Sequence, residues 1–321
     1  MNTIPTTFRH SKTPYTVVGG RKTDRIRKHI YPLSFVILNR RGRFYREKLI
    51  RQLSLEEVGE ILYVTDGEYS HSMTTLEQEY PLIRILHIKK RVTPGEKINI
   101  GIDESRGEWS FVLWDDMQFS SLSSLFKSFR GIREKGNLCS VPVIRNRAGS
   151  TIPSVMVPGF MKGELKVMHW LPKESGMLSI FPFDYCGLYN KDKFLLTGGY
   201  DYTFTNPYWQ KLDFGFRIYM WGEKIDLEPS ILLFYGEEIP EEDSTPDESY
   251  KYFFLKNMAV RFNGDCGVLP LGQFFQFMLK SDSGPVNALR EFLLVRRWVR
   301  INRFRFKQDA LRVIDLWEVD E

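Results

Sequence analysis

Two adjacent carboxylates, Asp115 and Asp116, end an apolar run in the segment GEWSFVLWDDM at residues 107–117. The run from Trp109 to Trp114 has the length and composition of a buried strand. Ligands of open α/β sheets bind at the carboxyl ends of the strands, because the loops there fan out over a crevice while the strands behind them stay rigid. The two acids therefore predict a metal or phosphate site, and a polar turn after a strand is the alternative.

The strand that carries these acids is the last of four apolar runs that alternate with helical patterns. The other strands are expected at residues 33–38, 60–65 and 83–87, and the helices at residues 44–55, 73–79 and 94–105. This alternation predicts a parallel sheet with right-handed crossovers, in which the carboxyl ends of the strands share one edge. Asn39, Asp66 and His87 should therefore lie near the two acids, and Arg40 follows Asn39 where a nucleotide could be met.

Composition excludes several classes of protein. The 321 residues are 42% hydrophobic, which is enough for a sizeable core, and the net charge of +5 lacks the dense basic signature of a nucleic-acid-binding protein. The three cysteines have no CxxC spacing, which excludes a zinc ribbon and suits a reducing compartment. No apolar run reaches about eighteen residues, and the first residues lack the apolar core of a signal peptide. We therefore expect a cytoplasmic protein that does not bind nucleic acid.

Two segments carry a local excess of charge. Residues 237–248 hold seven acids and no Lys or Arg, which is typical of a solvated loop. Residues 290–307 hold seven cations interleaved with apolar residues, which predicts a basic amphipathic helix. Such a helix either lies on an anionic membrane, which for a cytoplasmic protein would be the inner membrane face, or packs on the core with its Arg stems over apolar surface.

The remaining patterns divide the chain into three parts. Residues 1–30 are polar and basic without an apolar period, which predicts a loosely packed N-terminal arm. Beyond residue 117 we expect helices at 119–134 and 208–221, strands at 138–144 and 154–157, and a hairpin at 159–168. From residue 227 onward the chain becomes more helical, so the predicted parts are 1–30, 31–226 and 227–321.

The motifs, taken in order, resemble those of the GT-A nucleotide-sugar glycosyltransferases, specifically the family-2-like group. The match lies in VILNR, in GEKINIGIDESRGEWSFVLWDDM, and in TGGYD followed by LDFGFRIYMWGEKI, and it covers residues 33 to 225. The resemblance implies an α/β GT-A fold, which is Rossmann-like with a mostly parallel central sheet and flanking helices. The predicted C-terminal extension would be added to this fold.

The resemblance also implies roles for individual residues. The nucleotide of the sugar donor would be bound by Asn39, Arg40, Asp66, Asn99 and Asp115. Asp116, with Asp115 beside it, would hold Mn²⁺ or Mg²⁺, because cleavage of a nucleoside-diphosphate sugar leaves a charged diphosphate that a divalent cation stabilises. The acceptor side would contain Gly198, Gly199 and Arg217. From their chemistry alone, Trp209 either stacks on a sugar face or packs in the core, and Asp184 is a candidate partner for acceptor hydroxyl groups.

The catalytic base is where the chain departs from the family pattern. An inverting enzyme needs a carboxylate to deprotonate the acceptor hydroxyl, and the family takes it from an acidic pair at positions that are Gln210 and Lys211 here. Three alternatives follow. Asp213 or Asp201 serves as the base, the enzyme retains configuration by a route without such a base, or the chain binds without turnover.

We therefore predict a metal-dependent hexosyltransferase, inverting or retaining, that moves a sugar from a nucleotide-diphospho-sugar to a glycan or glycolipid acceptor. Family habit and the basic helix place this activity in cell-envelope polysaccharide assembly. One alternative is a non-catalytic glycan- or partner-binding protein on a glycosyltransferase scaffold. Another is a sugar-nucleotide nucleotidyltransferase, although NRRGRF at residues 39–44 is a poor version of the Gly-rich loop that such enzymes favour.

Overall fold

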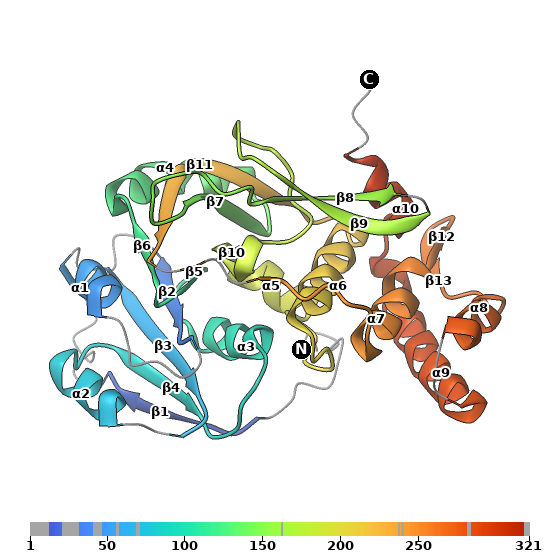
Figure 1. Ribbon diagram of the computed structural model, residues 1–321, viewed down its shortest axis with the longest axis horizontal. Helices are drawn as coiled ribbons and strands as arrows, with labels where there is room; N and C mark the ends of the chain where they lie inside the picture. The colour runs from blue at the N-terminus through green and yellow to red at the C-terminus, as the bar shows by residue number, and fades with distance from the viewer. Residues whose placement is uncertain are drawn as a thin grey trace.

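A nine-stranded mixed sheet runs through the middle of the protein (Figure 1). The computed structural model describes residues 13–20, 32–40, 47–55, 58–68, 71–161, 163–236, 238, 241–280 and 284–317. The strand order is β1-β4-β3-β2-β5-β10-β7-β11-β6. The strands of this sheet are β1 (Tyr15–Gly19), β2 (Leu33–Leu38), β3 (Glu60–Asp66), β4 (Arg84–Ile88), β5 (Trp109–Trp114), β6 (Met117–Phe119), β7 (Cys139–Arg145), β10 (Gly187–Asn190) and β11 (Ile225–Tyr235).

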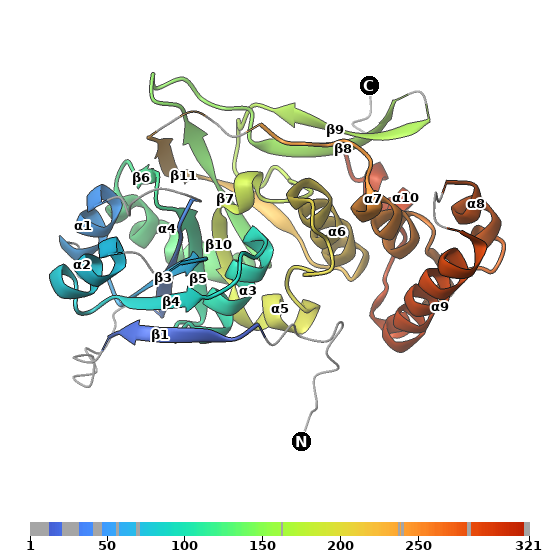
Figure 2. The ribbon, with the colours of Figure 1, turned by 60° about the horizontal axis from the view of Figure 1, so that its bottom comes forward.

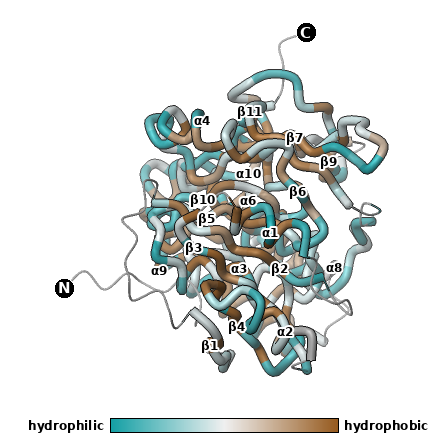
Figure 3. Tube along the Cα trace, turned by 90° about the vertical axis from the view of Figure 1, so that its left-hand side faces the viewer, coloured by the Kyte–Doolittle hydropathy of each residue, from teal (hydrophilic) through white to brown (hydrophobic). Residues whose placement is uncertain are grey.

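Most strands of the sheet point in one direction, as predicted. Neighbours along the run β4-β3-β2-β5 pair in parallel. Strand β10 is antiparallel to both β5 and β7, so β7 runs with β5, and β11 is parallel to β7. All six residues of β2 and all six of β5 are buried, which explains their unbroken apolar sequences, because helices cover both faces of the sheet here. Figure 3 shows these strands as a hydrophobic centre.

Helices complete the layers. Their bounds are α1 (Glu47–Leu55), α2 (His71–Glu79), α3 (Pro94–Glu104), α4 (Leu122–Lys135), α5 (Lys191–Thr197), α6 (Pro207–Met220), α7 (Glu248–Phe253), α8 (Gln273–Lys280), α9 (Pro285–Asn302) and α10 (Ala310–Asp315), with the short turns η1 (Phe183–Tyr185), η2 (Phe254–Met258) and η3 (Arg303–Arg305). Helices α1 and α2 lie on one side of β2, β3 and β4, and α3 lies on the other (Figure 1). This arrangement follows from right-handed crossovers that run in opposite directions along the sheet.

Local signals place the two helices that matter most for the site. Helix α3 begins where predicted, since the Thr93 hydroxyl accepts the Glu96 amide at 3.3 Å and Pro94 occupies the first turn. Helix α6 begins in the same way, with the Asn206 side chain accepting the Tyr208 amide at 2.8 Å and Pro207 following. Side-chain caps fix where both helices begin, and this determines which face of each helix the following side chains occupy.

Smaller strands lie outside the central sheet. A hairpin of β8 (Val155–Met161) and β9 (Glu164–Trp170) is longer than the expected hairpin at 159–168. A second pair, β12 (Arg261–Asn263) and β13 (Cys266–Val268), lies beside α8 and α9 (Figure 1). These two helices are at the end of the molecule opposite α1 and α2 (Figure 2). No helix among the described residues is long and apolar enough to cross a membrane.

Two predicted boundaries differ from the structure. Residues 15–19, expected within a loose arm, form β1, which pairs antiparallel with β4 through main-chain hydrogen bonds that need no apolar period. Strand β11 crosses the expected boundary at residue 226 and continues to Tyr235 beside β7 and β6. The central sheet is therefore completed by residues that the sequence pattern assigned to the extension. Residues 1–12 and 21–30 of the predicted arm lie outside the described residues.

Candidate functional site

Polar side chains from three neighbouring strands meet at the carboxyl edge of the sheet. Asn39 follows β2, Asp66 ends β3, and Asp115 and Asp116 follow β5. Because β2 lies between β3 and β5, these residues come together as the alternating pattern predicted. His87, in β4, is at the same edge and buried.

The Asp115 carboxylate is held by donors from β3 and from the residues that follow β2. Its Oδ2 atom accepts the Asn39 side-chain amide at 2.9 Å and the Tyr63 hydroxyl at 2.7 Å, and Oδ1 accepts the Arg40 backbone amide at 3.4 Å. Burial raises the pKa of Asp115, and the hydrogen bonds from Tyr63 and Asn39 oppose that rise. The residue is therefore fixed in place by several contacts at the cost of partial desolvation of its charge.

Arg40 is the cation at the centre of the site. Its Nε atom lies 2.6 Å from Asp116 Oδ2, and its Nη2 atom pairs with the carboxylate of Asp184. The guanidinium also lies over the Trp114 ring, 4.2 Å from the ring centroid. Burial would lower the pKa of Arg40, but the charges of Asp184 and Asp116 raise it well above its usual range. A permanent positive charge therefore lies between two carboxylates, in the place where a diphosphate would be met.

Asp184 is held by an unusual turn. Asp184 and Tyr185 have φ values of 46° and 63°, in the left-handed region that residues other than Gly rarely adopt. The Tyr235 hydroxyl donates to Asp184 Oδ2 at 2.5 Å, and the Trp114 indole donates to the Asp184 carbonyl at 2.9 Å. Such backbone conformations persist where surrounding contacts enforce them, and they concentrate at functional sites. Asp184, expected on the acceptor side, therefore lies with the strand-end acids.

One carboxylate oxygen in the site has no partner in the described chain and could coordinate a divalent cation. Asp116 Oδ1 is buried and has no hydrogen-bond partner among the described residues, whereas its Oδ2 pairs with Arg40. Among all the residues that the structure describes, no group of three or more His, Cys, Asp or Glu side chains could hold a metal by itself. Mg²⁺-type cations at phosphate sites commonly take only one or two carboxylates and complete their shell with phosphate oxygens and water. The donor set therefore fits a cation shared between Asp116 and a bound diphosphate.

Asp66 is engaged by protein groups on both oxygens. Lys97 Nζ lies 2.5 Å from Asp66 Oδ1 inside the protein, and the Val92 amide donates to Oδ2 at 3.0 Å. The same lysine donates to the Asn39 carbonyl at 3.1 Å. Asp66 thus anchors α3 to the strand edge, and any nucleotide contact would use this already ordered carboxylate.

Asn99 and the two glycines form a second anchor. The Asn99 side chain donates to the Tyr200 carbonyl at 2.6 Å and accepts the Tyr200 amide at 2.8 Å. Gly198 ends α5 with a φ of 84°, and Gly199 has a φ of 62° with the Asn99 Oδ1 atom 2.4 Å from where a Cβ would lie. We expected Asn99 at the nucleotide, but its amide group is instead paired with the backbone of this glycine segment.

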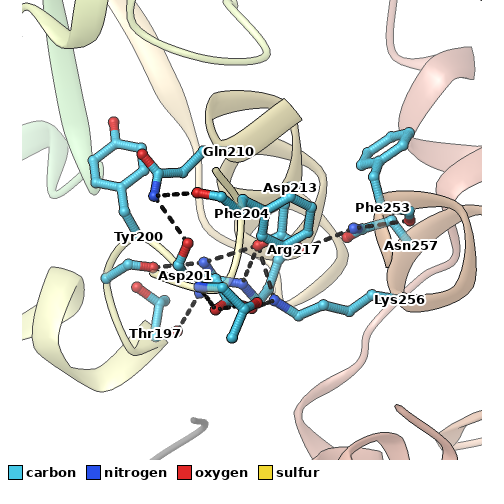
Figure 4. A network of polar contacts seen from close by, with 12 residues as sticks. Thr197, Tyr200, Asp201, Phe204, Gln210, Asp213, Arg217, Phe253, Lys256 and Asn257 are labelled. Carbon is cyan, nitrogen blue, oxygen red and sulfur yellow. Dashed lines mark hydrogen bonds and ion pairs between the residues drawn. The ribbon is translucent and has the colours of Figure 1, made fainter. Parts of the chain in front are cut away.

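Asp213 and Asp201, the predicted bases, lie in a buried ion-pair cluster (Figure 4). Lys256 Nζ is 2.9 Å from a carboxylate oxygen of each, and Asn257 donates to Asp213 Oδ1 at 2.9 Å. Burial would raise the pKa of Asp213, but the charges of Lys256 and Arg217 lower it overall. The sequence led us to expect a carboxylate open to an acceptor, whereas both acids here are neutralised inside the protein.

Arg217 and Trp209, also expected on the acceptor side, contact protein groups. Arg217 is 1% exposed and donates to the carbonyl groups of Thr197 and Gly199, besides pairing with Asp213 at 3.4 Å. The Trp209 indole donates to the Thr245 carbonyl at 3.0 Å. Both side chains therefore fasten α6 to its neighbours.

The two residues in place of the family's acidic pair have different surroundings. Gln210 is fully buried, and its side chain accepts the Gly95 amide at 3.1 Å and the Tyr185 hydroxyl at 3.0 Å. It also donates to the Asp201 carbonyl at 2.9 Å. Lys211 forms an ion pair with Glu242, from the acidic segment that the sequence predicted to be a solvated loop. A carboxylate is thus present here, but it comes from another part of the chain.

Sequence reasoning missed several members of these networks. Tyr63 donates to Asp115 and Tyr235 to Asp184, through side chains that an apolar strand pattern treats as core. Lys256 carried a usable signal, because it is a single cation after an apolar run in FFLKNM and is 0% exposed in the fold. Glu242 carried none, since one acid among seven in a run cannot be distinguished by type or spacing.

Comparisons with solved structures agree on the architecture, although no protein-family profile and no curated protein matches the sequence. The structure of S. aureus TarS 1–349 in complex with UDP-GlcNAc has a TM-score of 0.53 at 13% identity, over 84% of this chain and 74% of that chain. GalNAc-T7 with UDP, GalNAc and Mn²⁺ has a TM-score of 0.51 at 12% identity, over 84% of this chain and 57% of that chain. The chain thus spans little more than half of the GalNAc-T7 structure. At these identities the likeness shows the fold, and the predicted GT-A fold is confirmed.

Proposed function

We propose that this chain is a glycosyltransferase that takes a sugar from a nucleoside diphosphate and transfers it to a hydroxyl group of a glycan or glycolipid. The observation that supports this most is the arrangement of Asp115, Asp116 and Asp184 around Arg40 at the carboxyl edge of β2 and β5. A GT-A fold alone would not assign a function, because function resides in the site.

Different residues would bind the ribose, the diphosphate and the cation of the donor complex. In this proposal Asp115, which is held by Asn39 and Tyr63, would accept a ribose hydroxyl, and Arg40 would meet the diphosphate. Asp116 would hold Mn²⁺ or Mg²⁺ through its unpartnered Oδ1 atom. When bound, the cation supplies Lewis-acid stabilisation of the charge that develops on the leaving diphosphate.

Asp213 and Asp201 have a structural role in this proposal. Their partners, Lys256 and Arg217, give a cluster with two negative and two positive charges, all buried. Removing a proton from an acceptor would need an accessible carboxylate, and neither of these side chains is exposed. Their role in the fold is to hold α6 and the segment around Gly198 and Gly199 against η2.

The donor assignment is tested by thermal-shift titration of UDP, UDP-GlcNAc and UDP-GalNAc with and without Mn²⁺. We expect stabilisation that requires Mn²⁺ and disappears in Asp116→Asn, while the surface variant Asp265→Asn responds like the wild type. A chain that none of these ligands stabilises would not have the proposed donor site. Stabilisation without UDP release in any acceptor screen would favour the binding protein instead.

We also propose that the enzyme works at an anionic membrane surface through its C-terminal helices. A groove of about 340 Å³ is lined by Arg296, Arg297, Arg300 and Arg303 together with apolar residues such as Leu293. None of these arginines forms an ion pair with a carboxylate of the described chain. A cationic groove with apolar walls suits phospholipid head groups, and it supports a lipid-linked acceptor. The cell-envelope setting stays a prediction from the family resemblance.

A further inference from the structure

An open cavity lined by Phe183 and Tyr208 has a carboxylate in its wall. Its volume is about 470 Å³, within the range of small-molecule sites. Apolar and aromatic side chains make up most of the lining, and Glu241, Glu242 and His169 supply polar groups. Phe183, which lines the cavity, directly precedes Asp184 in the strained turn, and Asp184 pairs with Arg40, so one chain segment contributes to both the cavity and the acid cluster.

The segment that supplies Glu242 is fastened to α6. The Trp209 indole donates to the Thr245 carbonyl at 3.0 Å, and the Asn206 side chain donates to the Asp243 carbonyl at 3.1 Å. Thr245 in turn donates its amide to the Asp243 side chain at 3.0 Å. Contacts at Asp243 and Thr245, just after Glu242, therefore hold this segment against the start of α6, which a solvated loop would not do.

Within this segment the two oxygens of Glu242 have different surroundings. Oε1 pairs with Lys211, whose ammonium lies 5.1 Å from the Phe181 ring centroid and 5.3 Å from that of Tyr185. Oε2 is buried and has no hydrogen-bond partner among the residues that the structure describes. One oxygen is thus held by a cation. The other has no partner in the described chain, and it belongs to a side chain that is 17% exposed and lines the cavity, unlike those of Asp201 and Asp213.

The two tyrosines nearest Glu242 in charge terms do not supply a base. Burial raises the pKa of Tyr185 well above its usual range, and the charges of Tyr200, Glu242 and Asp184 add to the rise. Burial and then Glu242 raise the pKa of Tyr208, which lines the cavity, to about 12. Both phenols therefore stay protonated near neutral pH, so the lining groups that could accept a proton are Glu241, Glu242 and His169, of which Glu242 is held by Lys211.

We propose that Glu242 is the catalytic base of the transfer reaction and that the cavity holds the sugar unit bearing the acceptor hydroxyl. The inference rests on the proposed function. In the step, the acceptor O–H proton moves to Glu242 Oε2 and the acceptor oxygen forms a bond to the anomeric carbon. The bond from that carbon to the diphosphate breaks, and its electron pair leaves with the nucleoside diphosphate. Lys211 acts as a positioning residue, because it holds Oε1 and thereby directs Oε2.

The experiment measures UDP release from UDP-GlcNAc and UDP-GalNAc, with water as acceptor, alongside UDP affinity by calorimetry. Glu242→Gln should lower the rate by at least about 100-fold, the range expected for loss of a general base, with UDP affinity unchanged within about twofold. Glu242→Asp should recover part of the rate. The control is Glu238→Gln, an exposed acid of the same segment, which should match the wild type.

The outcomes separate this inference from the proposed function. If wild-type protein binds none of the nucleotides, the donor site itself is wrong. If it binds UDP and releases it from the sugar, and Glu242→Gln does so equally fast, only the base assignment fails. Loss of rate in His169→Asn with full rate in Glu242→Gln would assign the base to the imidazole instead. UDP binding without any release would also overturn the assignment, since no reaction would need a base.

Discussion

At the scale of single residues, the same residue type serves opposite purposes in two places. Asp213 is surrounded by Lys256, Arg217 and Asn257, so its charge is compensated inside the protein. Asp116 keeps one buried oxygen without a partner in the described chain. An acid whose charge is fully compensated stabilises the fold, whereas an acid with an open oxygen is available to a ligand.

The compensated acid predicts a pH dependence of stability. The pKa of Asp213 is lowered in the folded protein, so its contribution to stability is present above its unfolded pKa and is lost as the pH falls through the folded value. Asp213→Asn leaves two buried cations short of a partner and should cost about 3–5 kcal/mol at pH 7. Urea unfolding at several pH values should show this cost shrinking below a pH of about 4. A constant cost across the range would contradict the ionised pairing.

Arg40 predicts a change in nucleotide affinity. Arg40→Lys keeps a positive charge but loses the planar fork that bridges Asp116 and Asp184. We expect UDP affinity to fall by about tenfold or more, which corresponds to about 1.4 kcal/mol. Calorimetry would check this, with the exposed Arg147→Lys as a matched control. Equal affinities of the two variants would show that Arg40 does not meet the nucleotide.

At the scale of elements, the sequence predicted the parallel half of the sheet well. Strands β2 to β5 are apolar runs buried on both faces, and helix α3 has a cap, a proline and a closing residue that can be recognised locally. Strand β1 could not be recognised, because an edge strand that is half exposed has no apolar period, and its pairing with β4 joins segments far apart in the chain.

The site shows the same division. The strand-end acids and Asn39 follow from strand pattern, since any parallel sheet brings its carboxyl ends together. The contact of Glu242 with Lys211 does not follow, because it depends on how residues 241–247 cross α6 after β11. Lys256 shows the limit most clearly, since its partners Asp201 and Asp213 are 55 and 43 positions away in sequence.

The arginine-lined groove beside α9 leads us to predict membrane binding. The full-length protein should sediment with vesicles that contain phosphatidylglycerol and remain in solution with phosphatidylcholine alone. Replacing Arg296, Arg300 and Arg303 together with Gln should abolish sedimentation and leave UDP binding unchanged, because these side chains line a groove away from the strand edge. Wild-type protein that stays in solution with both vesicle types would contradict a membrane role for the groove.

At the scale of the whole molecule, the C-terminal part is joined to the central sheet through buried charges. Lys256 and Asn257, from η2, complete the cluster around Asp213 of α6, and Asp247, Thr245 and Glu242 precede α7 in the segment that reaches the cavity. The predicted extension therefore contributes residues to the buried cluster around Asp213, and removing it would leave Asp213 without its lysine.

This connection predicts that the two parts unfold together. Lys256→Met removes the cation shared by two buried carboxylates and should destabilise the fold by about 3–5 kcal/mol. Unfolding followed at tryptophans of both parts, such as Trp114 and Trp298, should remain a single transition in the wild type. Two separate transitions in the wild type would show that the extension is an independent domain.

The central claim is that a nucleoside diphosphate binds where Arg40, Asp115 and Asp116 meet, and a crystal structure with UDP and Mn²⁺ tests it most directly. The account predicts diphosphate oxygens within hydrogen-bond distance of the Arg40 guanidinium and a cation bound to Asp116 Oδ1. It also predicts the ribose beside Asp115. UDP bound in the arginine groove of α9, or at the strand edge without contact to Arg40 and Asp116, would contradict it.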